Sequence, residues 1–314
     1  MDPANLPEVE SVSPDSKRKR LDGECSDAVR FTDSATPLSG PEEALPTPNG
    51  PDSTVYAMNG LKRGKVLIFN HFKFDERKKG EKSLETRHGT DEDVKALFET
   101  LPKLGFSNDD IKEFKDCTKK EIWKEAEKLR DDVDLKKSDC LIVVILTHGE
   151  QNDILWAKDE KYCLYELINE FKPSLLHSMA GKPKIFIVEA PRGEKIDYGV
   201  NLTAINNGSS GTQEDSFYPQ NDTFKYPEHA DLMILMSSHH GHTSNLYANP
   251  KQGSWFIQQL CSVIEQCDPK TDSIIDIIIA TNSAVSKEKG KDDVKQISSF
   301  YSTFTKQMFF DVGN

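Results

Sequence analysis

Two short polar segments carry side chains that could do chemistry. Thr147-His148-Gly149-Glu150 follows an apolar run at 140–146, and Glu189-Ala190-Pro191-Arg192-Gly193 follows another at 184–188. An imidazole such as that of His148 is suited to general acid–base catalysis near neutral pH. By itself, a histidine after a strand is a weak signal, because structural histidines occur there at least as often. Any chemistry therefore depends on the elements that bring the two segments together.

The apolar runs have the pattern of buried strands. Residues 65–70, 140–146, 184–188 and 232–236 are short and almost wholly apolar, as in parallel strands that are covered on both faces. Helical patterns alternate with them, which predicts an α/β sandwich of three layers with a mostly parallel central sheet and helices on both faces. In such a sheet, sites gather beyond the carboxyl ends of the strands, where both polar segments lie.

Capping signals and apolar spacing place the helices. Thr90 and Asp93 have the spacing of a capping box, and the helix expected after them carries an i, i+3, i+4, i+7 apolar stripe. Thr118 and Glu121 repeat the signature. Further helices are expected at 165–171 and from Gly253-Ser254 onward, whereas 274–280 fits either a helix or a strand.

The composition limits the classes of function. The 314 residues carry a net charge of −12 with basic residues among acidic ones, which disfavours nucleic acid or an anionic membrane as a partner. The N-terminus lacks the apolar stretch of a signal peptide, and no run approaches the ~20 apolar residues of a membrane span. We therefore expect a cytoplasmic protein whose six cysteines are free thiols instead of a disulfide framework.

Two stretches fall outside the expected elements. Residues 1–54 are rich in Pro, Ser, Asp, Glu and Gly, which predicts a disordered leader. Within it, Lys17-Arg18-Lys19-Arg20 has the composition of a nuclear-import patch, although such a run is more often merely solvated. Residues 200–226 lack apolar periodicity and predict a long, disordered internal loop between the folded parts at 55–199 and 227–314.

Taken together, the segments resemble the caspase family of cysteine peptidases. In that family the catalytic cysteine lies in a Q-A-C-[RQG]-G motif with its histidine about 50 residues upstream, and here His148 precedes Pro191 by 43 residues. Further matches in chain order cover nearly all of residues 56–310, at Leu67-Ile68-Phe69-Asn70-His71, Arg87-His88-Gly89-Thr90-Asp91, Lys182-Pro183-Lys184, Gly253-Ser254-Trp255-Phe256-Ile257-Gln258 and Thr305-Lys306-Gln307-Met308.

The resemblance implies a division of the chain. Residues 1–54 correspond to the short prodomain of an executioner-type caspase, 55–199 to the large subunit, 200–226 to the cleavable intersubunit linker and 227–314 to the small subunit.

The match fails at the position of the nucleophile. Caspases cut peptides after aspartate by thiolate attack, and the resemblance places Pro191 where the cysteine should be. Proline has no nucleophilic atom and no backbone N–H, and in this family that N–H and the one matching Gly149 stabilise the oxyanion. For a comparable catalytic unit, loss of one member costs roughly 10⁶ in turnover. His148 and Gly149 are therefore expected to be vestigial.

The substrate pocket implied by the resemblance is altered as well. Arg87 matches the first of two arginines that hold the substrate aspartate, whereas Leu246 replaces the second and Glu189 replaces a glutamine. Thr243 and Asn245 stand in place of aromatic pocket residues. Unit charges about 4 Å apart interact by roughly 4 kcal/mol at an effective dielectric constant near 20. An ionised Glu189 is thus expected to repel an aspartate and to pair with Arg87.

We therefore expect a pseudoenzyme of the apoptotic pathway, a pseudocaspase that activates an active caspase or acts as its decoy. The expected partner is a catalytically active caspase relative or a second copy of this chain, and the sequence does not distinguish activation from inhibition. The resemblance implies pairing through the final strand, formed by Ile297, Ser298, Ser299, Phe300, Tyr301, Ser302, Thr303 and Phe304. No cofactor is expected, and no metal, because His239, His240 and His242 lack zinc-site spacing and partner ligands.

Two alternatives from other classes stay open. One is a residual or redirected cysteine peptidase that uses Cys163 or Cys267, although neither follows a strand end near His148 in this alignment. The other is an adaptor that acts through the leader and the internal loop.

The linker is expected to be cut by an active caspase even if this chain cuts nothing. Thr212-Gln213-Glu214-Asp215 precedes Ser216 in the expected loop, and Asp33 precedes Ser34 in the leader. Proteases need extended, accessible chain. Digestion with an executioner caspase should give fragments ending at Asp215 that remain associated, as judged by mass spectrometry and gel filtration. An intact chain, or cuts only elsewhere, would refute the linker assignment.

Overall fold

The computed structural model describes residues 47–50, 52–77, 83–199, 227–247 and 249–310. The predictions for the leader and the internal loop, including Lys17-Arg18-Lys19-Arg20, Asp33 and Asp215, lie outside these residues and stay predictions.

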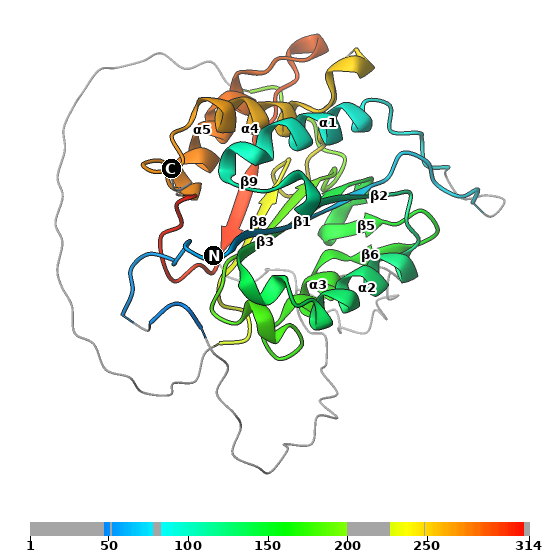
Figure 1. The fold of residues 1–314 in the computed structure, drawn as a ribbon. Coiled ribbons are helices and arrows are strands. Elements are labelled where there is room, and N and C mark those ends of the chain that lie inside the picture. The colour runs from blue at the N-terminus through cyan, green and yellow to red at the C-terminus, as the bar shows by residue number, and fades with distance from the viewer. Residues whose placement is uncertain (1–46, 51, 78–82, 200–226, 248, 311–314) are drawn as a thin grey trace, which may run out of the picture.

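The described residues form a six-stranded sheet in the order β2-β1-β3-β7-β8-β9 (Figure 1). All neighbouring strands are parallel except β9, which runs antiparallel to β8 at one edge. A small antiparallel sheet follows β3. The strands are β1 (Lys62–Asn70), β2 (Ile111–Lys115), β3 (Ser138–Leu146), β4 (Gly149–Glu150), β5 (Ile154–Trp156), β6 (Lys161–Cys163), β7 (Lys184–Glu189), β8 (Leu232–Met236) and β9 (Ser299–Ser302).

Helices cover both faces of the large sheet, as predicted (Figure 1). One layer contains α1 (Thr90–Thr100), α4 (Trp255–Gln266) and α5 (Ile274–Lys287), and the other contains α2 (Lys119–Lys128) and α3 (Leu164–Ile168). Short 3₁₀ helices lie at Leu101–Leu104, Asn108–Asp110, Leu129–Asp131, Leu135–Lys137, Gln151–Asp153, Asn169–Phe171, His177–Met179, Pro250–Gln252 and Lys291–Asp293.

Strand β3 shows why the sequence is apolar at every position from 140 to 146. Cys140, Ile142, Val144 and Leu146 pack into the core under α1, α4 and α5. Leu141, Val143 and Ile145 point to the opposite face and pack into the core under α2 and α3. Side chains alternate along a strand, so a central strand with a helical layer on each side needs apolar residues in both registers.

The capping predictions had mixed outcomes. The Thr118–Glu121 capping box at the start of α2 is confirmed. The one at Thr90–Asp93 is wrong, because Gly89 is the N-cap of α1 in the left-handed region (φ 96°) and Asp93 is buried. Residues 274–280, left open between helix and strand, begin helix α5, whose own capping box is formed by Ser273 and Asp276.

Two further predictions need correction. The last strand is shorter than the range 297–304, because ladder pairing with β8 is limited to Ser299–Ser302. Cys117, Cys140, Cys261 and Cys267 are free thiols as predicted, whereas Cys163 is disulfide-bonded. In the described part of the chain, no helix is long and apolar enough to cross a membrane.

Candidate functional site

The two polar segments meet at the carboxyl ends of β3 and β7. In the parallel register Leu146 lies beside Glu189, and the Thr147 N–H donates to the Glu189 carbonyl at 3.0 Å. A Cβ added to Gly149 would lie 2.3 Å from the Pro191 carbonyl oxygen, so only glycine fits against this backbone. Pairing of the two strands therefore places His148-Gly149 directly beside Ala190-Pro191.

His148 is held as a neutral imidazole. Its Nε2 lies 2.7 Å from the Glu85 carbonyl oxygen, which can only accept, so Nε2 carries the proton and donates. The ring packs beside that of Phe74 at a centroid distance of 5.0 Å. Burial lowers the pKa of His148, and the charge of Arg87 lowers it further, against the opposing effect of the hydrogen bond to Glu85.

The backbone around Pro191 is already engaged in the fold. The N–H of Arg192, the next residue, donates to the His242 carbonyl at 2.9 Å, and the Arg192 carbonyl accepts from the Gly241 N–H at 3.1 Å. Pro191 itself is half-buried. The Arg192 N–H is thus committed to the neighbouring loop and does not replace the donor that proline lacks.

Arg87, the first pocket residue, points into the protein interior. Only 5% of its surface is exposed, and its Nη1 donates to the Thr90 hydroxyl at 2.9 Å and to the His71 carbonyl at 3.4 Å. The guanidinium therefore helps to join the end of β1 to the start of α1.

Glu189 is buried. The predicted ion pair between Glu189 and Arg87 is wrong. Its Oε1 accepts from the Ser244 hydroxyl at 2.7 Å, and Oε2 has no hydrogen-bond partner. No ion pair within 4.0 Å joins Glu189 to Arg87, both of which the structure describes. Burial, reinforced by the charge of Asp93, raises the pKa of Glu189 to about 7, although Ser244 and Arg87 oppose the rise. The attraction between Glu189 and Arg87 is therefore electrostatic but not a direct contact.

The loop after β8 lies across this region without supplying a cation. The Asn245 backbone N–H and Nδ2 donate to Gln296 Oε1 at 2.7 and 3.0 Å. Leu246 forms a β-bridge with Ser254 and is 39% exposed. Asn245 is therefore held against the segment that leads into β9.

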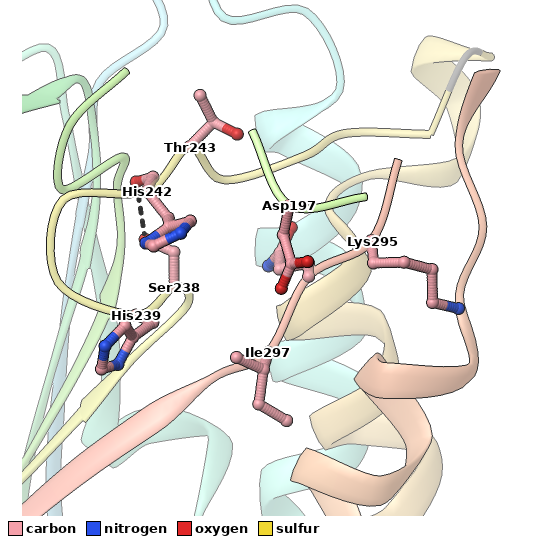
Figure 2. A pocket seen from close by; sticks show the side chains of 8 residues that line it. Asp197, Ser238, His239, His242, Thr243, Lys295 and Ile297 are labelled. Atoms are coloured by element: carbon pink, nitrogen blue, oxygen red, sulfur yellow. Dashed lines mark hydrogen bonds between the residues drawn. The ribbon is translucent and has the colours of Figure 1, made fainter. Parts of the chain in front are cut away.

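Thr243 lines a separate cavity of about 50 Å³ beside this loop. Figure 2 shows the side chains of His239 and His242 on one side and Asp197 on the other, while the Lys295 amine points away. The described residues include no group of three His, Cys, Asp or Glu that could hold a metal ion. The complete lining is Asp197, Ser238, His239, His242, Thr243, Lys295, Gln296 and Ile297.

Known proteins share this arrangement of strands and strand ends. A family model described as "Caspase domain" matches residues 63–309. This chain belongs to the caspase family. It is 33% identical over 235 residues to caspase-1 of Spodoptera frugiperda, which covers 74% of this chain and 71% of that protein. It is also 30% identical to caspase-8 of Mus musculus over 269 residues. That alignment covers 82% of this chain but only 52% of caspase-8.

Solved structures give the same assignment. The crystal structure of caspase-1 from Spodoptera frugiperda superposes with a TM-score of 0.72 at 28% identity, over 85% of this chain and 97% of that one. The predicted caspase-like sandwich is thereby confirmed. The chain spans about half of the length of mouse caspase-8.

Sequence reasoning missed two polar residues of this caspase domain. Asp93 accepts from the Ser254 N–H at 2.9 Å and from Gln258 Nε2 at 2.8 Å, which ties α1 to α4. Gln296 Nε2 donates to the Ser237 carbonyl at 2.6 Å. The role of Asp93 was missed because its spacing from Thr90 matches a capping box. No local sequence pattern indicates the role of Gln296.

Repair of the site should need three substitutions. Pro191→Cys alone restores a thiol and an N–H beside His148, but the buried Glu189 carboxylate and the missing second cation still oppose a substrate aspartate. We expect the single variant to react with an electrophilic thiol probe without efficient cleavage after aspartate. Adding Glu189→Gln and Leu246→Arg should be required for turnover of an Asp-containing fluorogenic peptide.

The matched control is the double variant Glu189→Gln, Leu246→Arg, which keeps Pro191. This variant should bind an aspartate-containing peptide more tightly than the original chain does, without cleaving it. Efficient cleavage after aspartate by Pro191→Cys alone would refute this description of the pocket.

Proposed function

We propose that this caspase-family chain is a non-catalytic regulator in the apoptotic pathway, which binds an active caspase or a second copy of itself and cleaves no peptide. The observation that carries the proposal is Pro191 packed beside His148-Gly149, at the position that the resemblance to the caspase cysteine motif assigns to the nucleophile. The proposal places the protein in the cytoplasm, where an active caspase would be available to it.

Loss of the reaction follows from the chemistry of the strand ends. A neutral imidazole beside a proline has no side-chain nucleophile to activate, and one of the two N–H donors for an oxyanion is missing. A His148-activated water would have to replace both, against a penalty of roughly 10⁶ for a comparable unit that lacks one member. These arguments support an inactive protein.

Apart from the missing nucleophile, the charges of the pocket residues disfavour binding of a substrate aspartate. Glu189 and Asp93 are buried carboxylates behind the strand ends, and Arg87 is the cation that acts on both. A substrate aspartate would add a further negative charge to a site that already has more acids than bases. Binding of peptides after the manner of an active caspase is therefore disfavoured before any chemical step.

The surface for a partner is the edge of the sheet at β9. Among the described strands, β9 pairs only with β8, and an edge strand presents backbone groups to which another strand can pair. Phe300 is 39% exposed and Tyr301 is 53% exposed, and Ile297 just before the strand is 38% exposed. Exposed aromatic residues on an unpaired edge favour association with a second chain.

The alternative of a redirected cysteine peptidase gains no support from the cysteines. Cys163 is disulfide-bonded, and burial raises the pKa of Cys267, opposite to the shift that activates a nucleophilic thiol. The adaptor alternative concerns residues 1–54 and 200–226, most of which lie outside the described residues.

Association should depend on the β9 edge and should change the partner's activity. We would mix this chain with an active executioner-type caspase from the same source, detect the complex by native mass spectrometry, and measure the partner's turnover of an Asp-containing fluorogenic peptide. Tyr301→Lys should abolish the complex and its effect, because it places a charge on the pairing edge. Increased turnover would indicate an activator, and decreased turnover a decoy.

Val133→Lys is the matched control, because Val133 is also an exposed apolar residue, 65% exposed, and lies before β3, away from the β9 edge. This variant should bind and modulate as the original chain does. No complex and no effect at tens of micromolar, or equal loss in both variants, would contradict the proposed role of β9.

A further inference from the structure

Behind the strand ends, three charged side chains from different elements form a buried charge cluster, made up of Arg87, Asp93 and Glu189. Arg87 precedes α1, Asp93 lies in its first turn and Glu189 ends β7. All three are at most 5% exposed. One segment of the chain contacts both acids, because Ser244 donates to Glu189 and Ser254, at the start of α4, donates to Asp93.

In each of the two carboxylates, one oxygen accepts hydrogen bonds and the other does not. Asp93 Oδ1 accepts from the Ser254 N–H and from Gln258, and Glu189 Oε1 accepts from Ser244. Asp93 Oδ2 and Glu189 Oε2 are buried with no hydrogen-bond partner within 3.5 Å, and the Ser254 hydroxyl, which lowers the pKa of both acids, is the donor nearest to hand for either. A buried, ionised carboxylate normally has donors to both oxygens, because an unpaired one loses its hydration without compensation.

The cluster has one cation for two acids. Arg87 donates to Thr90 and to the His71 carbonyl and makes no ion pair within 4.0 Å with either acid among the described contacts. His71, after β1, supplies no second positive charge, because burial and the charge of Arg87 lower its pKa to about 4. The facing groups on the β8 loop and on α4 are the neutral Ser244, Ser254 and Gln258. With both acids ionised, the interior would hold an excess negative charge.

We propose that Glu189 and Asp93 hold one proton between them in the folded protein at neutral pH, and that this proton stabilises the contact of Glu189 with Ser244 on the loop after β8. With one acid neutral, the cluster carries one negative and one positive charge, which the interior tolerates. On deprotonation the proton passes to solvent, and the excess charge favours movement of Glu189 toward water and separation from Ser244. Loss of the proton would thus weaken the contact between β7 and the loop after β8.

The ionisation behaviour of both acids agrees with this geometry. Burial, with the charge of Asp93, raises the pKa of Glu189 to about 7, and burial raises that of Asp93 to about 6. Because these values exceed those of the unfolded chain, the folded state binds more protons between about pH 4.5 and pH 7. The stabilisation is therefore complete at the acidic end of this window and is lost as the pH rises through about 7.

The test compares the original chain with Glu189→Gln, which keeps an acceptor for Ser244 but cannot ionise. The equilibrium constant for folding would be measured by urea unfolding from pH 5.5 to pH 8. The folding equilibrium constant of the original chain, divided by that of Glu189→Gln, should fall about 30-fold from pH 5.5 to pH 8. This is the change expected for one carboxyl whose pKa is 4.5 in the unfolded chain and about 7 in the folded protein. Glu127→Gln, which removes an exposed acid on α2, should behave like the original chain.

Two further measurements keep the proposal falsifiable if Glu189→Gln does not fold. Infrared spectra of the original chain at neutral pH should contain the carbonyl band of a buried protonated carboxyl, which Asp93→Asn should alter. Hydrogen exchange in residues 237–246, corrected for the intrinsic effect of pH, should be faster at pH 8 than at pH 6. Parallel stability curves for the original chain and Glu189→Gln would overturn the proposal, as would absence of the band or pH-independent protection.

Discussion

The parallel pairing of β3 with β7 is the interaction on which the rest of the structure depends. Both strands are buried on both faces, so their register is fixed by two helical layers packed against the sheet. That register sets Leu146 beside Glu189 and thereby brings His148-Gly149 against Ala190-Pro191. The same pairing that would assemble a caspase reaction centre instead assembles an imidazole beside a proline.

The residues at the strand ends contribute little to the packing of the sheet. Pro191 follows β7, where its lack of an N–H costs the sheet no ladder hydrogen bond. Glu189 is part of β7, and its backbone carbonyl still accepts from Thr147 while its side chain changes the charge of the interior. We infer that the substitutions at the strand ends remove reactivity and alter the pocket while leaving the packing of the sheet, α1 and α4 intact.

Local sequence patterns were sufficient where one element determines its own structure. The apolar run of β3, the Thr118–Glu121 capping box and the Ser254 start of α4 all follow from residues close together in the chain. Contacts between distant residues were not predictable in this way. Asp93 matches a capping box yet binds the N-terminus of α4, and Glu189 binds Ser244 in place of Arg87, because both depend on packing of elements far apart in sequence.

The most direct test of the account is peptide turnover by the purified chain after its linker has been cut, since cleavage would expose any latent activity. The fluorogenic peptide should contain aspartate before the reporter, and His148→Ala should serve as the comparison. Because a proline stands beside His148, both proteins should release fluorophore no faster than buffer. Clear turnover by the original chain that is abolished by His148→Ala would contradict it, because the strand ends would then form a working active site without a cysteine.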